Sequence, residues 1–143
     1  MRRVQRGTAG VEVLALGVLV LVFGTLLVAN AWAVIDAKLA ATAASREAVR
    51  AAVEAPDAGS AHEQGSAAAI AALRGMGRTS TPQVELSGEF GRCLRLVATV
   101  RLDVPAIILP GVTGHVGAFH VSASHSEVVD PFRSGLVGVA ACG

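Results

Sequence analysis

The fold is decided near the N-terminus, by the stretch RGTAGVEVLALGVLVLVFG that runs from Arg6 to Gly24. Between Glu12 and Asp36 the chain carries no charged residue. At about 1.5 Å of rise per residue, a helix over this interval is roughly 35 Å long, which is enough to cross a bilayer once. The later apolar run, Val104–Leu109, is too short to span. The sequence therefore predicts a single N-terminal membrane-spanning helix.

The charges on either side of this helix predict its orientation. Arg2, Arg3 and Arg6 precede it, whereas Asp36 and Lys38 follow it. Because basic residues are retained on the cytoplasmic side of a membrane, we expect the N-terminus inside and the C-terminus outside. The predicted location is the cytoplasmic (inner) membrane, crossed once.

Three fates of the N-terminal segment are open from the residues alone, and each predicts a different mature chain. A secretory signal peptide would be cut after the A-x-A pattern of Ala31 and Ala33. An uncleaved signal anchor would keep every residue. A short basic leader ending in glycine would be cut between Gly7 and Thr8, which leaves the apolar helix on the mature protein.

Glu12 bears on this choice because a carboxylate near the membrane core costs roughly 2.5 to 3.5 kcal/mol and is usually paired. A cut between Gly7 and Thr8 creates an amino group one helical turn before Glu12, and that amine can pair with the carboxylate. The free N–H groups and dipole of the helix N-terminus also favour a negative side chain. An ordinary helix-terminal glutamate is therefore the alternative.

Several of these features resemble a known family. The leader MRRVQRG, the following TAGVE that places Glu12 fifth after Gly7, and the uncharged helix beyond are similar to type IV pilin precursors. More narrowly, the chain resembles the TadE-like minor pilins, or pseudopilins, of the tight-adherence (Tad/Flp) pilus system. The segment Ala37–Val53, AKLAATAASREAVRAAV, is similar to the Ala-rich helix that follows the span in those proteins. The chain is longer than the major Flp pilins, which favours a minor subunit.

The resemblance implies a structural function and a set of partners. A prepilin peptidase would cut after Gly7, and Glu12 would set subunit register by meeting the Thr8 amine of a neighbour. The implied partners are that peptidase, other pilin subunits, the pilus or secretion assembly machinery, and the membrane. The competing hypothesis is an uncleaved single-pass anchor for an extracytoplasmic binding domain, in which Glu12 is only a helix-terminal charge.

Beyond the membrane the chain is expected to form an α+β head. Alanine-rich sequence continues the helix until Pro56, and Ile35, Leu39, Val49 and Val53 fall roughly on one face. Asn30 and Trp32 are typical of interfacial anchors at the outer end of the span. The predicted regions are a leader (1–7), a transmembrane helix (8–35), its extracytoplasmic extension (36–55), a linker or short helix (56–82) and a small β-rich head (83–143).

Alternation of apolar and polar residues predicts the strands of the head. CLRLVATVRLDV, from Cys93 to Val104, alternates with period two, and the weaker strand QVELSGEFG before it suggests a hairpin. AFHVSASHSEVV, from Ala118 to Val129, is a third strand candidate. The long helix packed on about three antiparallel strands is the smallest arrangement that buries both apolar faces, and this arrangement is pilin-like.

Cys93 and Cys142 are the only cysteines, and both fall in the region predicted to lie outside, where disulfides are permitted. A bridge between them would close a loop of about fifty residues and stabilise the head by roughly 4 kcal/mol. Two unpaired thiols are the alternative, because the sequence does not show that their Cα atoms approach each other.

No pattern in the sequence indicates catalysis, a cofactor or a metal site. His115, His120 and His125 recur at intervals of five, which on a strand sends neighbouring histidines to opposite faces. Phosphate-loop, zinc-protease and nucleophile-elbow motifs are absent from the sequence. The formal net charge is only +1 with scattered basic residues, which argues against a nucleic-acid partner. We therefore expect a protein that is not an enzyme.

Overall fold

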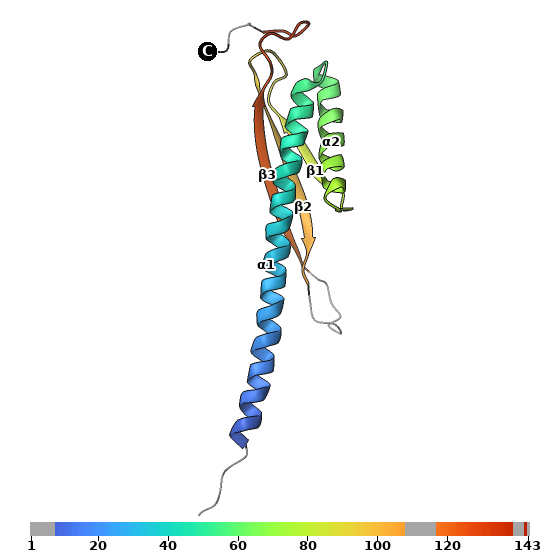
Figure 1. Ribbon diagram of the computed structural model, residues 1–143. Coiled ribbons are helices and arrows are strands. Elements are labelled where there is room, and N and C mark those ends of the chain that lie inside the picture. The colour runs from blue at the N-terminus through green and yellow to red at the C-terminus, as the bar shows by residue number, and fades with distance from the viewer. Residues whose placement is uncertain (1–7, 108–116, 139–141, 143) are drawn as a thin grey trace, which may run out of the picture.

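The computed structural model describes residues 8–107, 117–138 and 142. In these residues the element order is α1 (Thr8–Glu54), α2 (Ala58–Gly75), β1 (Gln83–Ser87), β2 (Arg95–Pro105) and β3 (Ala118–Val128). The strands form one antiparallel sheet in the order β1-β2-β3 (Figure 1). The predicted α+β class, with a long N-terminal helix on a three-stranded antiparallel sheet, is confirmed.

Helix α1 passes without a break from the predicted membrane segment into the head. It has 47 residues, so its axis is about 70 Å long at 1.5 Å per residue. The N-terminal half extends beyond the sheet and beyond α2, and the C-terminal half lies along both (Figure 1). Pro56 lies two residues after the last residue of the helix, where its ring and missing N–H prevent continuation.

The buried face of α1 is made almost entirely of small residues. Its members recur at helical spacing and are at most 4% exposed: Ala37, Ala40, Ala41, Ala44, Ser45, Ala48, Val49 and Ala52. The hydroxyl of Ser45 donates to the carbonyl oxygen of Thr42 at 3.0 Å, so this buried polar group is satisfied. Small side chains let the sheet and α2 approach the α1 backbone closely, and this close approach defines the core.

The sequence prediction of the packing face was wrong for two of its four residues. Ile35 is 54% exposed and Leu39 is 66% exposed, whereas Val49 is fully buried and Val53 partly buried. The prediction followed the large apolar side chains. The sheet instead packs where alanines permit contact, and Ile35 and Leu39 remain on the outside of the helix.

Helix α2 has 18 residues and occupies most of the region 56–82, for which the sequence predicts a linker or a short helix. Asp57 caps its N-terminus: the carboxylate accepts the Ser60 backbone N–H at 2.8 Å, and the Ser60 hydroxyl in turn accepts the Asp57 N–H. The hydrogen bond from the Ser60 backbone N–H, which favours the charged carboxylate, lowers the pKa of Asp57. Beyond Gly75 the chain turns through Gly77, whose φ of +75° favours glycine.

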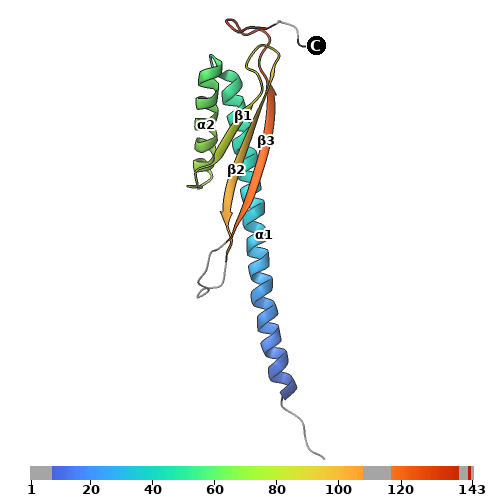
Figure 2. The same cartoon turned by 180° about the vertical axis from the view of Figure 1, so that it is seen from behind.

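The central strand β2 pairs antiparallel with β1 and with β3, which confirms the predicted hairpin. Its even-numbered residues face α1 and are buried: Leu96, Ala98, Val100, Leu102 and Val104. Figure 2 shows the opposite face, which neither helix covers. Polar cross-strand contacts occupy that face, including Thr99 Oγ1 with Ser124 Oγ at 2.9 Å and Arg101 with Glu85 at 2.8 Å.

Gly65 of α2 provides a test of the close packing. A Cβ atom at this position would lie 3.0 Å from the carbonyl oxygen of Ala48 and 3.1 Å from Leu86 Cδ1. Overpacking of this kind costs about 1 to 3 kcal/mol. We expect Gly65→Leu to lower the free energy of unfolding by about that amount, measured by thermal or urea unfolding of the full chain in detergent.

The matched control is Gly75→Leu at the exposed end of the same helix. A Cβ atom there meets no atom within 4 Å. Because leucine is a better helix former than glycine, this variant should be unchanged or stabilised by up to about 1 kcal/mol. Equal loss of stability in the two variants would contradict the packing account.

Candidate functional site

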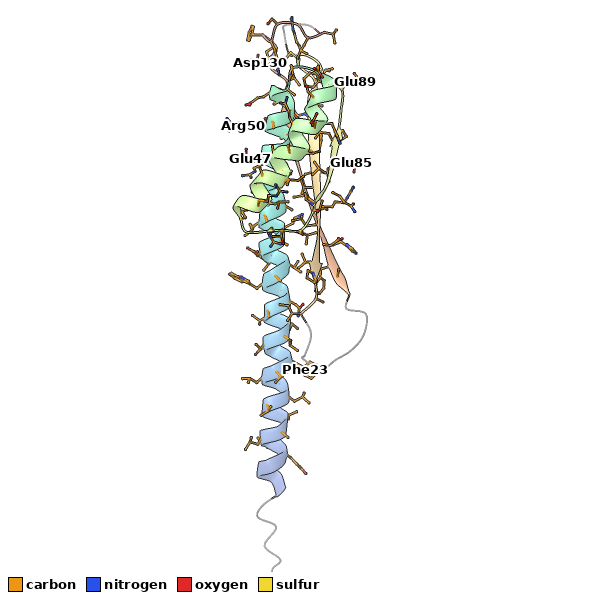
Figure 3. The ribbon with its side chains drawn as sticks, turned by 90° about the vertical axis from the view of Figure 1, so that its right-hand side faces the viewer. Phe23, Glu47, Arg50, Glu85, Glu89 and Asp130 are labelled. Atoms are coloured by element: carbon orange, nitrogen blue, oxygen red, sulfur yellow. A yellow bond between two sulfur atoms is a disulfide. The ribbon has the colours of Figure 1, made fainter. Side chains whose placement is uncertain are left out.

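The N-terminal half of α1 is the most unusual surface of the described chain. None of the side chains in its most apolar 18-residue window is buried, and the helix is long and apolar enough to cross a membrane. Large apolar side chains project from it on all sides, and Phe23 stands out from the ribbon in Figure 3. Leu27 is 71% exposed and Trp32 is 72% exposed. Such a surface requires either lipid or other protein around it.

An apolar stripe runs along one side of this helix and continues past the end of the uncharged segment. Its members follow a heptad pattern, with four residues at seven-residue spacing and two more on the same side: Leu14, Leu21, Val28, Ile35, Trp32 and Leu39. All six are more than half exposed. Ile35 and Leu39 lie beside the charged residues Asp36 and Lys38, so the apolar stripe reaches beyond the segment that a membrane would cover.

Glu12 is exposed on the first turns of α1. Among the described residues no ion pair includes it. Thr8 is the first residue of the helix, four residues before Glu12, which is about 6 Å along the axis. Gly7 lies outside the described residues, and so does the bond between Gly7 and Thr8 at which cleavage is predicted.

Asn30 bonds the head to α1 near the end of the uncharged segment of the helix. Its side-chain amide donates to the carbonyl oxygen of Ile107 at 2.9 Å, and its side-chain oxygen accepts the Ile107 N–H at 2.8 Å. The same amide also donates to the carbonyl oxygen of Leu26 at 2.8 Å. The Asn30 side chain therefore bonds both the N–H and the carbonyl of Ile107, as the backbone of a neighbouring β-strand would. This role was missed from the sequence, where Asn30 was interpreted as an interfacial anchor.

Two charged contacts hold the head to α1 beyond Asn30, at Asp36 and Lys38. Arg78, in the chain after α2, donates to the carboxylate of Asp36 at 2.5 Å. Two residues farther along α1, the ammonium group of Lys38 donates to the carbonyl oxygen of Ser122 on β3. Lys38 thereby occupies a backbone acceptor on the edge strand, where an unpaired carbonyl could otherwise recruit another strand.

The far end of the head is closed by contacts from the C-terminal segment. The guanidinium of Arg133 donates to the carbonyl oxygens of Val53 and Glu54 at 2.5 and 2.7 Å. These carbonyls end α1 and lack helical partners, so Arg133 acts as a C-terminal cap. The segment after β3 is thus attached directly to the end of the long helix.

The structure joins Cys93 and Cys142 in a disulfide, with their Cα atoms 5.1 Å apart. The sequence had left this pairing open. The two cysteines are 49 residues apart, and closing such a loop stabilises a fold by about 4 kcal/mol through the lost entropy of the unfolded chain. The Cys93 N–H also donates to the carbonyl oxygen of Val129 at 3.0 Å. Together these bonds tie the C-terminal tail to the start of β2.

The histidines lie apart from one another where the structure describes them. His120 Nδ1 lies 2.6 Å from Asp103 Oδ1 on the uncovered face of the sheet, whereas His125 is half-buried on the opposite face. His115 lies outside the described residues. No group of three His, Cys, Asp or Glu side chains that could hold a metal ion is found in the described part of the chain.

Comparisons with known protein families, with curated proteins and with solved structures find no match for this chain. What the site does must therefore be inferred from its own residues. These are an unburied apolar half of α1, a carboxylate near its start, and a head locked to its other half.

Asn30→Leu tests whether the asparagine holds the head to α1. The variant removes both bonds to Ile107 and leaves its backbone N–H and carbonyl without that partner, a loss of about 1 to 3 kcal/mol. We expect hydrogen exchange at the Ile107 amide to accelerate by about tenfold or more, measured by mass spectrometry on the full chain in detergent.

The control for this variant is Thr25→Val on the same helix. The Thr25 hydroxyl donates only to the carbonyl oxygen of Leu21, at 2.7 Å within α1. Its replacement should leave exchange at Ile107 unchanged. If Asn30→Leu also left that exchange unchanged, the asparagine would have no part in fastening the head.

Proposed function

We propose that this chain is a TadE-like minor pilin, or pseudopilin. It is a structural subunit that takes part in assembly of a Tad/Flp-type pilus or a related secretion apparatus after cleavage by a prepilin peptidase. One observation carries the proposal: the unburied apolar half of α1 is continuous with the helix on which the head is packed. The choice of this family rests on the resemblance of the leader and of the segment around Glu12 to TadE-like pilin precursors.

The dimensions of α1 support a membrane-spanning function for its N-terminal half. From Glu12 to Trp32 the helix rises about 30 Å, which is the thickness of a bilayer hydrocarbon core. Trp32 then lies at the outer interface, where tryptophan is enriched, and Asp36 lies about 6 Å farther out among the headgroups. A helix from the core of a soluble protein would be largely buried, and this one is not.

The apolar stripe supports contact between subunits. In lipid alone, apolar side chains gain little from facing one another, because lipid tails are equally apolar. Ile35 and Leu39, however, lie beyond the proposed membrane boundary and are more than half exposed. Covering them removes apolar surface from water, which favours helix-to-helix contact with a neighbouring subunit at this level.

Glu12 has a defined part in this proposal. Cleavage between Gly7 and Thr8 places a new ammonium group at the start of α1. The carboxylate of Glu12 on one subunit then pairs with the Thr8 amine of its neighbour, which neutralises a charge that is costly in lipid and fixes the register of the two helices. Without cleavage this amine does not exist.

The mature N-terminus is the first test. The full chain is isolated from cells with and without an active prepilin peptidase, and its N-terminal peptide is identified by mass spectrometry. We expect Thr8 as the first residue only when the peptidase is active. Met1 in both preparations would support the uncleaved anchor, and Val34 would reject both by indicating an ordinary signal peptide.

Glu12→Ala is the second test, and it separates assembly from insertion. The variant should still insert into the membrane, because the apolar length of α1 is unchanged. Its incorporation into the assembled apparatus should fall at least tenfold, measured by quantitative immunoblotting of the sheared or purified assembly.

Glu47→Ala is the matched control, because Glu47 is an exposed carboxylate on the part of α1 proposed to lie outside the membrane. It should assemble normally. Normal assembly of Glu12→Ala would remove the role assigned to Glu12.

A further inference from the structure

We propose that the junction between the apolar half of α1 and the head binds one anionic phospholipid. Its acyl chain lies in a groove along α1, and its phosphate lies in a cleft at the C-terminal end of α2. This inference rests on the proposed membrane-spanning function of α1, and it adds a specific ligand to that function.

The groove has the shape and polarity that suit an acyl chain. It is an open groove of about 750 Å³ along α1, beside Ile107. Gly24, Thr25 and Ala29 supply small side chains along α1, while Val28 and Trp32 supply larger apolar ones. The Thr25 hydroxyl is already bonded to the carbonyl oxygen of Leu21, so it presents little unsatisfied polarity. A neighbouring helix is a bulkier occupant, and binding of such a helix would displace the lipid.

The cleft has the donors that suit a phosphate. It encloses about 70 Å³ and is lined by Ile70 and Arg74 of α2 and by residues 78–81, which include one arginine and three hydroxyl-bearing side chains. The guanidinium of Arg74 makes no ion pair among the described residues. Guanidinium groups present planar pairs of N–H donors that match phosphate oxygens.

Arg78 links the cleft to α1, because it lines the cleft and binds Asp36 of that helix. Ala29, Ala33 and Asp36 follow one another at spacings of four and three residues, which places them on one helical face. Ala29 and Ala33 line the groove, and Asp36 binds Arg78 at the cleft. Figure 3 shows the chain after α2 crossing α1 on its way to β1. From Ala33 to Asp36 the rise is only about 4.5 Å, so the groove ends within one helical turn of the carboxylate that binds Arg78.

The local charge favours an anionic lipid over a zwitterionic one. Arg74 and Arg78 both line the cleft, and among the described residues only Arg78 pairs with a carboxylate, that of Asp36, which leaves one positive charge in excess. The carbonyl groups that end α2 do not oppose an anion strongly, because the N–H groups of Met76, Gly77 and Arg78 already occupy those of Leu73 and Arg74. A basic side chain near an anionic headgroup contributes about a fivefold preference.

The single tryptophan makes this proposal measurable, because Trp32 lines the groove. The full chain is placed in vesicles of phosphatidylcholine and phosphatidylglycerol at fixed proportions, and only one of the two lipids carries brominated acyl chains, which quench tryptophan fluorescence. We expect brominated phosphatidylglycerol to quench Trp32 more than brominated phosphatidylcholine does at the same mole fraction, by about fivefold in relative binding constant.

Two variants separate the cleft from the groove. Arg74→Gln should remove most of the preference for phosphatidylglycerol, whereas Arg50→Gln, an exposed arginine on the extracytoplasmic part of α1, should keep it. Gly24→Leu fills the groove without changing charge, and a Cβ atom there meets no atom within 4 Å. It should lower quenching by brominated phosphatidylglycerol toward the level of the bulk lipid.

The outcomes also distinguish this proposal from the one it rests on. Equal quenching by the two lipids, or equal effects of the two arginine variants, would overturn the lipid site and leave the membrane span intact. Loss of the preference when inorganic phosphate replaces chloride at constant ionic strength would show that the cleft takes free phosphate instead. Absence of quenching by either lipid would mean that Trp32 does not meet the bilayer, and the membrane span itself would fail.

Discussion

The rest of the structure depends on the close contact between the alanine face of α1 and the two layers that cover it. The sheet packs against one side of this helix, and α2 packs against the neighbouring side, where Gly65 lies close to the α1 backbone. Alanine serves two needs here, because it favours the helix intrinsically and it lets other backbones approach. With the second half of α1 held in this way, the first half extends from the head as a helix that needs no partner inside its own chain.

Much of the fold could be predicted because the deciding signals are local. The interval without charge between Glu12 and Asp36 indicates a long apolar helix, and the alternation from Leu94 to Leu102 indicates a half-buried strand. Pro56 marks the end of the first helix. Each of these signals acts through neighbours in the sequence, so one chain is enough to reveal it.

What could not be predicted depends on segments far apart in the sequence. Asn30 and Ile107 are 77 residues apart, and Arg78 reaches Asp36 across 42 residues. No periodicity connects such pairs. The predicted burial of Ile35 and Leu39 was wrong for a related reason. Their size suggests burial, but the face of α1 that is buried depends on how closely the sheet can approach the helix. The start of α2 at Ala58 did have a local signal, since Asp57 and Ser60 stand at capping-box spacing.

The bonds between Asn30 and Ile107 have a mechanical consequence. They attach the head at a point where α1 leaves its apolar half, and Arg133 attaches it again at the far end of the same helix. A body fixed at two points along one rigid axis follows every rotation of that axis. A tilt of α1 by about 10° at its base would displace its other end, about 70 Å away, by roughly 12 Å. Rotation of α1 about its own axis would likewise turn the uncovered face of the sheet in a different direction.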